Sequence, residues 1–297
     1  MADGWFEAAR RCLELAQPEA KCAAVRAFDD AFRSGDLGRD EDVPVAPIGE
    51  PGRPERPELV DPARVPRRRL GSAEGRAALV HAIAHIEFNA INLALDAVYR
   101  FRGMPRAYYA DWLSVAVDEA RHFELLTGRL AALGCAYGDL PAHDGLWTMA
   151  RKTADSCLVR MALVPRVLEA RGLDVTPGMI EIFRKAGSAD AVAALETIYA
   201  EEVGHVAYGS KWFHFLCGRE NADPKDVFHA LVQRYFHGAL KPPFNEEKRA
   251  KAGIPPDFYW PLTETGFDRG FMLVMFDDKT RPEPVTRRKT SKKDKIK

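Results

Sequence analysis

The chain of 297 residues lacks the features that mark several common protein classes. It contains no Val-, Ile- and Thr-rich segment of alternating polarity, so a β-sheet is not expected. No stretch reaches the roughly 20 uncharged apolar residues of a membrane span. The N-terminus, MADGWFEAARRCLEL, has no apolar run of signal-peptide length. These absences favour an all-α, cytoplasmic protein.

Cysteine is scarce and scattered. The cysteines are odd in number, and no two of them are closer than ten residues: Cys12, Cys22, Cys135, Cys157 and Cys217. Such spacing matches neither a disulfide framework nor a zinc ribbon. A reducing cytoplasm suits them.

The chain also lacks a net charge. Lys plus Arg and Asp plus Glu both number 43, so the whole-molecule charge favours neither nucleic acid nor an acidic partner. Residues 281–297 contain eight basic and two acidic residues, which predicts a basic, solvated and disordered tail. Because this tail has no interleaved aromatic residues of the kind that bind single-stranded nucleic acid, we do not expect a nucleic-acid partner. We also expect no membrane association, since no stretch of the chain has the length of a membrane span.

What the sequence does contain is helical periodicity. Hydrophobic residues make up 46% of the chain, enough to bury a core. Residues 1–37 form a predicted helical extension with two short helices, broken at Gln17-Pro18. A connector of residues 38–70 follows, because seven prolines lie between Gly38 and Pro66. We interpret it as a surface strap, with a functional lid as the alternative.

Four long helices are predicted in residues 71–240, followed by a C-terminal strap of residues 241–280 that packs along the bundle. Ser72 and Gly134 supply a start and a stop signal, and Gly172 is expected to cap the third helix, which Pro165 should kink. The predicted long helices are Ser72 to Arg102, Arg106 to Leu133, Leu146 to Arg171 and Ala189 to Leu216, with a shorter one from Pro224 to His237.

The chemistry lies in a repeated pattern of glutamate and histidine. Two of the eight histidines follow a glutamate by three residues, and each pair falls within a predicted long helix: Glu119 with His122, and Glu202 with His205. Residues three apart share one face of a helix, so each pair can converge on one metal ion.

Each pair is preceded, one helix earlier, by a solitary glutamate in apolar surroundings. Glu87 lies 32 residues before Glu119, and Glu169 lies 33 residues before Glu202. A glutamate from the facing helix can bridge to a second ion, and four carboxylates offset two divalent cations. Without metal, so many buried carboxylates would repel one another. The pattern predicts a two-metal site inside a four-helix bundle.

These motifs resemble a known group of proteins. The segments HIEFNAINLALDA, DEARHFELL, LEARGLDVTPGM and EEVGHVAYG resemble a mainly bacterial family called domain of unknown function 455, within the ferritin-like superfamily of di-iron carboxylate proteins. The resemblance covers about residues 70 to 262, including LKPPFNEEKRAKAGIPP. It implies a ferritin-like four-helix bundle with a long crossover between the second and third helices. It also implies six metal ligands: Glu87, Glu119, His122, Glu169, Glu202 and His205.

Several neighbouring residues have two interpretations. Asp118 and Glu201 directly precede ligand glutamates, and they are either surface charges or partners that orient a ligand histidine. His81 and His85 are four apart, but His85 lies on the face opposite Glu87, so we interpret both as surface or packing residues.

Aromatic and basic residues near the ligands are similarly ambiguous. Arg121 and Arg171 pair with acids or steer an anionic substrate, and the sequence does not choose between these roles. Four aromatic residues on the ligand face suit proton or electron transfer, although core packing is the commoner role: Tyr199, Tyr208, Trp112 and Trp212.

The resemblance implies a di-iron oxidoreductase that uses O2 or peroxide to hydroxylate or otherwise oxidise an organic substrate. It is more distantly similar to bacterial hydroxylases of modified tRNA and other di-iron oxygenases, which fixes no substrate. The expected cofactor is two Fe ions, with Fe/Mn and Mn/Mn as alternatives. The expected partners are O2 and a small-molecule substrate, with a reductase as an option, for a monomer or homodimer. The alternatives are a ferritin-like iron-binding or ferroxidase protein and a non-catalytic helical scaffold.

Overall fold

The computed structural model describes residues 4–42, 44–66, 69–236 and 240–263. Apart from two isolated β-bridges, these residues form helices joined by turns and loops, which confirms the all-α class. The predicted basic tail, residues 281–297, and the 264–280 part of the predicted C-terminal strap lie outside the described residues.

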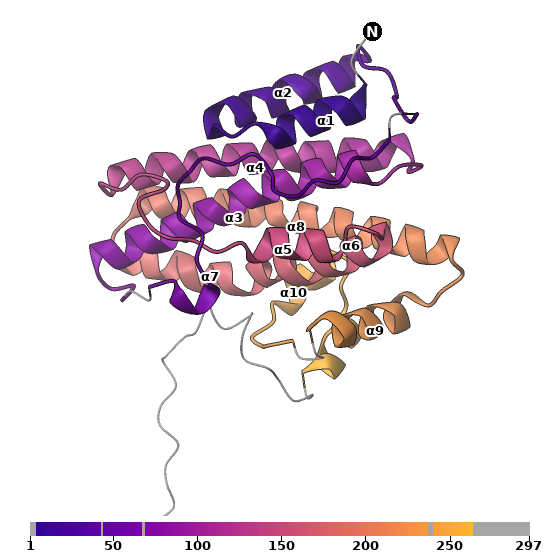
Figure 1. Ribbon diagram of the computed structural model, residues 1–297. Coiled ribbons are helices and arrows are strands. Elements are labelled where there is room, and N and C mark those ends of the chain that lie inside the picture. Colours follow the sequence, from indigo (N-terminus) through magenta and orange to yellow (C-terminus); the bar gives the residue numbers. More distant parts are fainter. Residues whose placement is uncertain (1–3, 43, 67–68, 237–239, 264–297) are drawn as a thin grey trace, which may run out of the picture.

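Long helices build the central layer of the molecule (Figure 1). Helix α3 (Ala73–Arg100) packs along α4 (Arg106–Ala132), α4 packs on α8 (Ala189–Arg219), and α8 packs on α7 (Ala170–Lys185). Asp111 contacts Trp212 and Asp118 contacts His205, so α4 and α8 run antiparallel. The boundaries of the first, second and fourth predicted helices are confirmed to within a turn.

Helix α3 is the most deeply buried of these helices. The hydroxyl of Ser72 accepts the Gly75 N–H at 3.0 Å and caps its start, as predicted. Within the described part of the chain, α3 is the one helix long and apolar enough to cross a membrane, but 83% of its apolar window is buried in the fold. That burial is typical of the core helix of a water-soluble protein.

The prediction of one third helix from Leu146 to Arg171 is wrong, because the helix breaks after Lys152 and the later helix continues past Arg171 to Lys185. Helix α5 (Gly145–Lys152) is separate, because the Ser156 hydroxyl accepts the Val159 N–H and starts a new helix, α6 (Cys157–Leu163). A π-helical segment, η2 (Val164–Glu169), then joins α6 directly to α7.

Two local causes explain the difference. Pro165 has no N–H to donate, and at this point the chain takes the wider π turn instead of ending or simply kinking. Gly172 does not cap the helix, because the apolar face continues through the buried residues Leu173 and Phe183. Packing of this face outweighs the weak helix propensity of glycine, and α7 ends only near Gly187, which has φ +70°.

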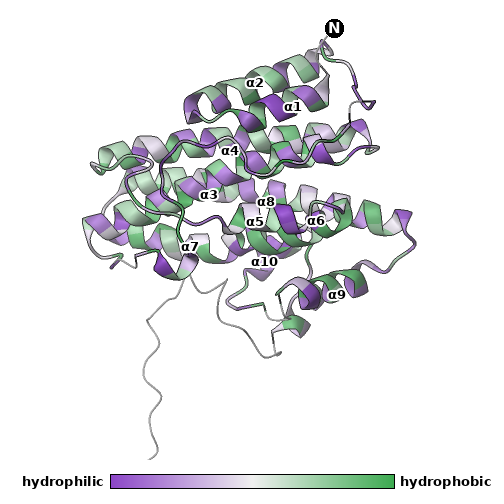
Figure 2. Cartoon of the chain, viewed as in Figure 1, coloured by the Kyte–Doolittle hydropathy of each residue, from purple (hydrophilic) through white to green (hydrophobic). Residues whose placement is uncertain are grey.

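The N-terminal extension forms the predicted helix pair. Helices α1 (Trp5–Glu14) and α2 (Pro18–Ser34) pack on α3 and α4, and both carry hydrophilic as well as hydrophobic residues (Figure 2). Lys21 is fully buried, and its Nζ donates to the carbonyls of Leu13 and Gly52 and to Asn92 of α3. This ammonium therefore joins the helix pair, the connector and the core.

The C-terminal residues pack against the long helices. Helix α9 (Pro224–Phe236) matches the predicted shorter helix, and α10 (Glu246–Lys251) contacts α7 and α8. Two 3-10 turns, η3 (Pro256–Phe258) and η4 (Trp260–Leu262), complete this part.

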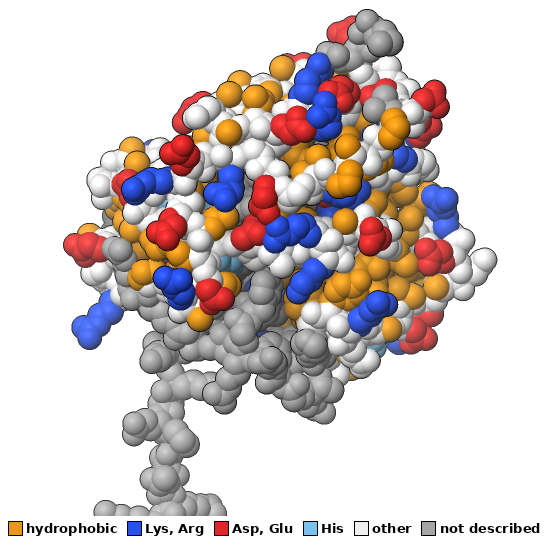
Figure 3. Space-filling view, in the orientation of Figure 1, with side chains coloured by type: hydrophobic (Ala, Val, Ile, Leu, Met, Phe, Trp, Pro, Cys, Tyr) orange, Lys and Arg blue, Asp and Glu red, His pale blue; other side chains and the backbone are white. Residues whose placement is uncertain are grey.

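The face in Figure 3 mixes charges of both signs, as the balanced composition predicts.

Candidate metal centre

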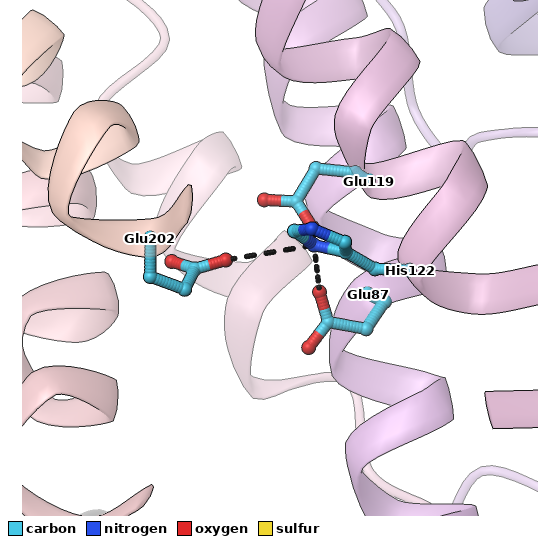
Figure 4. A group of neighbouring side chains, drawn as sticks. All are labelled: Glu87, Glu119, His122 and Glu202. Carbon is cyan, nitrogen blue, oxygen red and sulfur yellow. Dashed lines mark hydrogen bonds and ion pairs between the residues drawn. The ribbon is translucent and has the colours of Figure 1, made fainter. Parts of the chain in front are cut away.

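Side chains from three of the long helices converge in the core (Figure 4). Glu87 of α3, Glu119 and His122 of α4, and Glu202 of α8 each offer one ligand atom, and these atoms lie within 4.8 Å of one another. Nδ1 of His122 lies 3.3 Å from both Glu87 and Glu119. The side chains of Glu119 and His122 are at most 1% exposed, so the cluster is shielded from bulk water.

His205 completes a second position beside the first. Its Nδ1 lies 3.1 Å from Oε1 of Glu119 and 3.3 Å from Oε1 of Glu202. Glu119 therefore faces His122 with one oxygen and His205 with the other. Glu202 Oε1 lies near both imidazoles, 3.8 Å from that of His122. The two carboxylates that lie near both imidazoles are thus the glutamates of the repeated motif.

Glu169 stands on the π-helical segment η2, at its junction with α7. Burial and the negative charges of Glu202 and Glu119 raise the pKa of Glu169 to about 8. Its Oε2 is buried and has no hydrogen-bond partner in the described part of the chain. Five of the six predicted ligands are therefore joined by direct contacts, and Glu169 lies close enough for the charges of Glu202 and Glu119 to act on it.

The electrostatics of the cluster are those of a cation site. Burial, followed by the charge of Glu119, raises the pKa of Glu87 well above its usual range. Burial opposes the imidazolium of His122, but the carboxylates of Glu119 and Glu87 outweigh it and raise the pKa of His122 to about 11. The pKa of His205 is raised in the same way by Glu202 and Glu119. Positive charge is strongly favoured at the centre.

Two buried atoms test whether a metal fits. Oε2 of Glu169 has no hydrogen-bond partner within the described residues, and Nδ1 of His205 forms no hydrogen bond there although it lies beside two carboxylates. Buried polar atoms without partners are costly in a folded protein. Because both belong to side chains of the cluster, a cation bound among the carboxylates would satisfy them. The donor set fits a metal centre on this ground.

The outer nitrogen of each imidazole is held by an acid from the other helix. Nε2 of His122 lies 2.6 Å from Glu201 Oε2, and Nε2 of His205 lies 3.3 Å from Asp118 Oδ2. A carboxylate accepts, so each Nε2 carries a proton, and each Nδ1 would bind a metal in place of its own proton. Of the two roles considered for Asp118 and Glu201, the contacts favour orientation of a histidine. Arg121 contacts both acids.

The other singled-out residues serve packing or attachment. His85 lies 3.0 Å from the Tyr137 hydroxyl, and the Gly138 N–H donates to Nε2 of His81 at 3.0 Å. Burial lowers the pKa of His81 to about 4 and that of His85 to about 3. Both are therefore neutral packing residues, but neither is at the surface. Arg171 donates to the Lys241 carbonyl at 2.9 Å and holds the C-terminal segment.

Two of the four aromatic residues on the ligand face, Trp212 and Tyr199, have hydrogen-bond partners. Trp212 donates to Asp111 at 2.8 Å and packs edge-on against Tyr108. The Tyr199 hydroxyl accepts the side-chain amide of Asn245 at 2.6 Å. Trp112 is buried, and its indole N–H makes no hydrogen bond within the described residues.

A cavity of about 420 Å³ lies away from the cluster, at the ends of α3 and α8. Arg100, Met104 and Arg219 contribute to its lining, and none of the six predicted ligands does. Sequence reasoning did not foresee the π-helical turn under Glu169 or the exchange of outer partners between α4 and α8. The only signal for the exchange was that an acid directly precedes each ligand glutamate.

Comparison with known proteins places this arrangement in a family. The family model described as "Protein of unknown function (DUF455)" matches residues 14–260. The chain belongs to this family. An uncharacterized protein of Haemophilus influenzae is 42% identical to this chain over 260 residues. The matched region covers 84% of this chain and 90% of the relative. No solved structure matches the chain.

Proposed function

We propose that this DUF455 protein is a ferritin-like di-iron carboxylate oxidoreductase. In this proposal residues 71–240 form the four-helix bundle, residues 1–37 and 38–70 form the extension and connector, and residues 241–280 form a strap. The observation that carries the proposal is the convergence of a doubled Glu-x-x-His pattern on one buried cluster. The six proposed ligands are Glu87, Glu119, His122, Glu169, Glu202 and His205.

The composition of the ligand set supports iron or manganese. Four carboxylates and two imidazoles are hard to intermediate donors, and no cysteine is among them. Two Fe ions are the preferred occupants, and Fe/Mn or Mn/Mn pairs are alternatives. When bound, the pair would supply activation of O2 or peroxide for hydroxylation or a related oxidation of an organic substrate.

The side chains of the chain have definite tasks in such a reaction. Glu119 and Glu202, which lie near both imidazoles, would contribute to both metal positions, and Glu87 and Glu169 would each contribute to one. Asp118 and Glu201 accept the Nε2 protons and fix the rings with Nδ1 inward. The near-complete burial of Glu119 excludes bulk water from the centre.

The remaining parts of the proposal concern partners. Hydroxylation with O2 requires two electrons from a donor, for which a reductase is the proposed partner, and the second oxygen atom leaves as water. Two electrons are already present when peroxide is the oxidant. We propose a cytoplasmic monomer or homodimer that acts on a small molecule.

Anaerobic loading with Fe(II) tests this function. We expect about two irons per chain, near-ultraviolet ligand-to-metal absorption after exposure to air, and loss of iron in Glu119→Ala and His205→Ala. His229→Ala changes a half-buried histidine of α9 that is not one of the six ligands; it is the matched control and should retain both irons. Stoichiometry well below two, or full retention in both ligand variants, would refute the site.

Size-exclusion chromatography separates catalysis from iron storage. A monomer or dimer supports the enzyme, because storage proteins of this superfamily assemble into cages. A closed cage of many subunits that accumulates iron beyond the two bound ions would replace the oxidoreductase with an iron-handling protein. If the chain folds but binds no metal, the non-catalytic helical scaffold is the remaining interpretation.

A further inference from the structure

One guanidinium lies between the two outer carboxylates of the cluster. Nη2 of Arg121 donates to Asp118 Oδ1 at 3.0 Å and to Glu201 Oε2 at 2.5 Å. The same two carboxylates accept the Nε2–H groups of His205 and His122. A single carboxylate therefore lies between the Arg121 guanidinium and each ligand imidazole.

The outer contacts cross between helices. Asp118 of α4 holds His205 of α8, and Glu201 of α8 holds His122 of α4. The orientation of each ring thus depends on the helix that does not carry it. Arg121 on α4 joins the two crossed contacts, so neither carboxylate can move without affecting the other.

The charges around Arg121 argue against a role in substrate binding. Asp118 and Glu201 are both acidic and about one-third exposed, and without a cation between them they would repel. The guanidinium already contacts two carboxylates, so little positive charge remains for an anionic ligand. Of the roles that the sequence left open for Arg121, pairing with acids is the one that its contacts favour.

A single arginine serves both halves of the repeat. A shift of 83 residues relates Glu119 to Glu202, and the same shift relates Arg121 to Gly204. Gly204 is exposed, and an added Cβ would meet no heavy atom within 4 Å. The position that corresponds to Arg121 on α8 therefore has no side chain, although there is room for one.

We infer that Arg121 is a positioning residue that couples the two metal positions by holding the crossed carboxylates of Asp118 and Glu201. This inference rests on the proposed two-metal centre. Its consequence is that loss of Arg121 weakens both positions together. Loss of a residue that held only one imidazole would weaken metal binding at one position only. The Arg121 side chain is 41% exposed, so its removal leaves no cavity in the core.

The test uses Co(II) alone as the probe, titrated into the full-length metal-free chain. We expect about two Co(II) to bind the wild type, and both to bind about 10- to 100-fold more weakly to Arg121→Met. Arg121→Lys keeps the positive charge and should recover part of the affinity. Arg129→Met is the matched control, because Arg129 is also on α4 and pairs with Asp190 of α8 at 2.9 Å. It should bind like the wild type.

A second readout separates positioning from general stability. With 15N-labelled histidine, the Nε2–H signals of His122 and His205 should be protected from exchange in the wild type and in Arg129→Met, and both should exchange faster in Arg121→Met. If Arg121→Met does not fold, Arg121→Gln carries the same expectations. The thermal midpoints of the folded variants are compared to show that the fold is retained.

The outcomes distinguish the coupling from the metal centre. If the wild type binds no Co(II), the proposed centre fails, and the coupling fails with it. If the wild type binds two but the Arg121 variants match Arg129→Met, or if only one position weakens, the centre stands and the coupling is overturned.

Discussion

The two halves of the centre share one sequence plan but differ in structure. In the α3–α4 half, Nδ1 of His122 is hydrogen-bonded to both Glu87 and Glu119. In the α7–α8 half, Nδ1 of His205 lies 3.1 Å from Glu119 and 3.3 Å from Glu202, but Oε2 of the solitary Glu169 has no hydrogen-bond partner within the described residues. Identical spacing therefore supplies the same donors twice, but it does not set how the solitary glutamate is held.

The backbone under Glu169 accounts for the difference. Glu87 and Glu119 lie inside regular α-helices, whereas Glu169 ends the π-helical turn that contains Pro165. Gly209 of α8 faces this turn, and a Cβ there would come within 2.3 Å of the Pro165 ring. The α7–α8 half depends on this close contact, and π turns are frequent at functional sites.

The largest expected effect separates shared from unshared ligands. Glu119→Ala removes the carboxylate that faces both imidazoles, so we expect loss of both metal ions. Glu169→Ala removes a ligand of the α7–α8 half only and should leave about one ion per chain. Metal content after gel filtration measures both. Equal losses in the two variants would contradict the division into shared and unshared ligands.

The second-largest expected effect is a loss of folding stability at low pH that is due to the buried His81 of α3. The folded pKa of His81 is lowered to about 4 by burial, and its ordinary value is 6.5. Between pH 6.5 and pH 4, His81 is protonated in the unfolded chain but not in the folded chain. Its contribution to the free energy of unfolding is therefore complete above pH 6.5 and is lost as the pH falls to 4. The loss due to His81 is about 3 kcal/mol.

Urea unfolding between pH 7 and pH 4.5 measures this loss. His81→Gln retains an acceptor for the Gly138 N–H but does not titrate, so its stability should fall less steeply with acid. In the α7–α8 half, the buried polar contact is instead an ion pair between Asp174 of α7 and Arg249, with an N–O distance of 2.6 Å. An unchanged slope in His81→Gln would remove His81 as a cause of acid sensitivity.

The third effect is a steric test of the α7–α8 half. Gly209→Ala should destabilise the fold by about 1–3 kcal/mol, because the new Cβ overlaps the Pro165 ring. It should also weaken one metal position more than the other. Gly204→Ala is the control on the same helix, where nothing lies within 4 Å of an added Cβ, and it should stabilise by up to about 1 kcal/mol. Thermal unfolding and Co(II) titration of both variants check this, and a neutral Gly209→Ala would show that the contact is dispensable.

The smallest effect comes from moving the arginine between the halves. Gly204 follows Glu201 by three residues, as Arg121 follows Asp118. The double variant Arg121→Gly with Gly204→Arg should therefore bind Co(II) within about tenfold of the wild type, and more tightly than Arg121→Gly alone. If the double variant binds no better than the single one, the two halves are not equivalent at this position.

Helix identity and ligand type were predictable because both depend on local rules. Ser72 is a good N-cap whatever it packs against, and residues three apart always share a helix face. The third helix was mispredicted because Gly172 and Pro165 have more than one outcome. Burial of Leu173 and Phe183 carried the helix past the glycine, and a single sequence does not show which surfaces will be buried.

By itself, the sequence determined the all-α class, most of the helix boundaries and the two Glu-x-x-His pairs that meet in the cluster, since periodicity and spacing act within one helix. Only the tertiary structure decided which carboxylates are shared, which acid orients which histidine, and that Arg121 joins them. Those contacts connect residues that are 79 to 87 positions apart. They exist only because α4 and α8 pack antiparallel at one particular register.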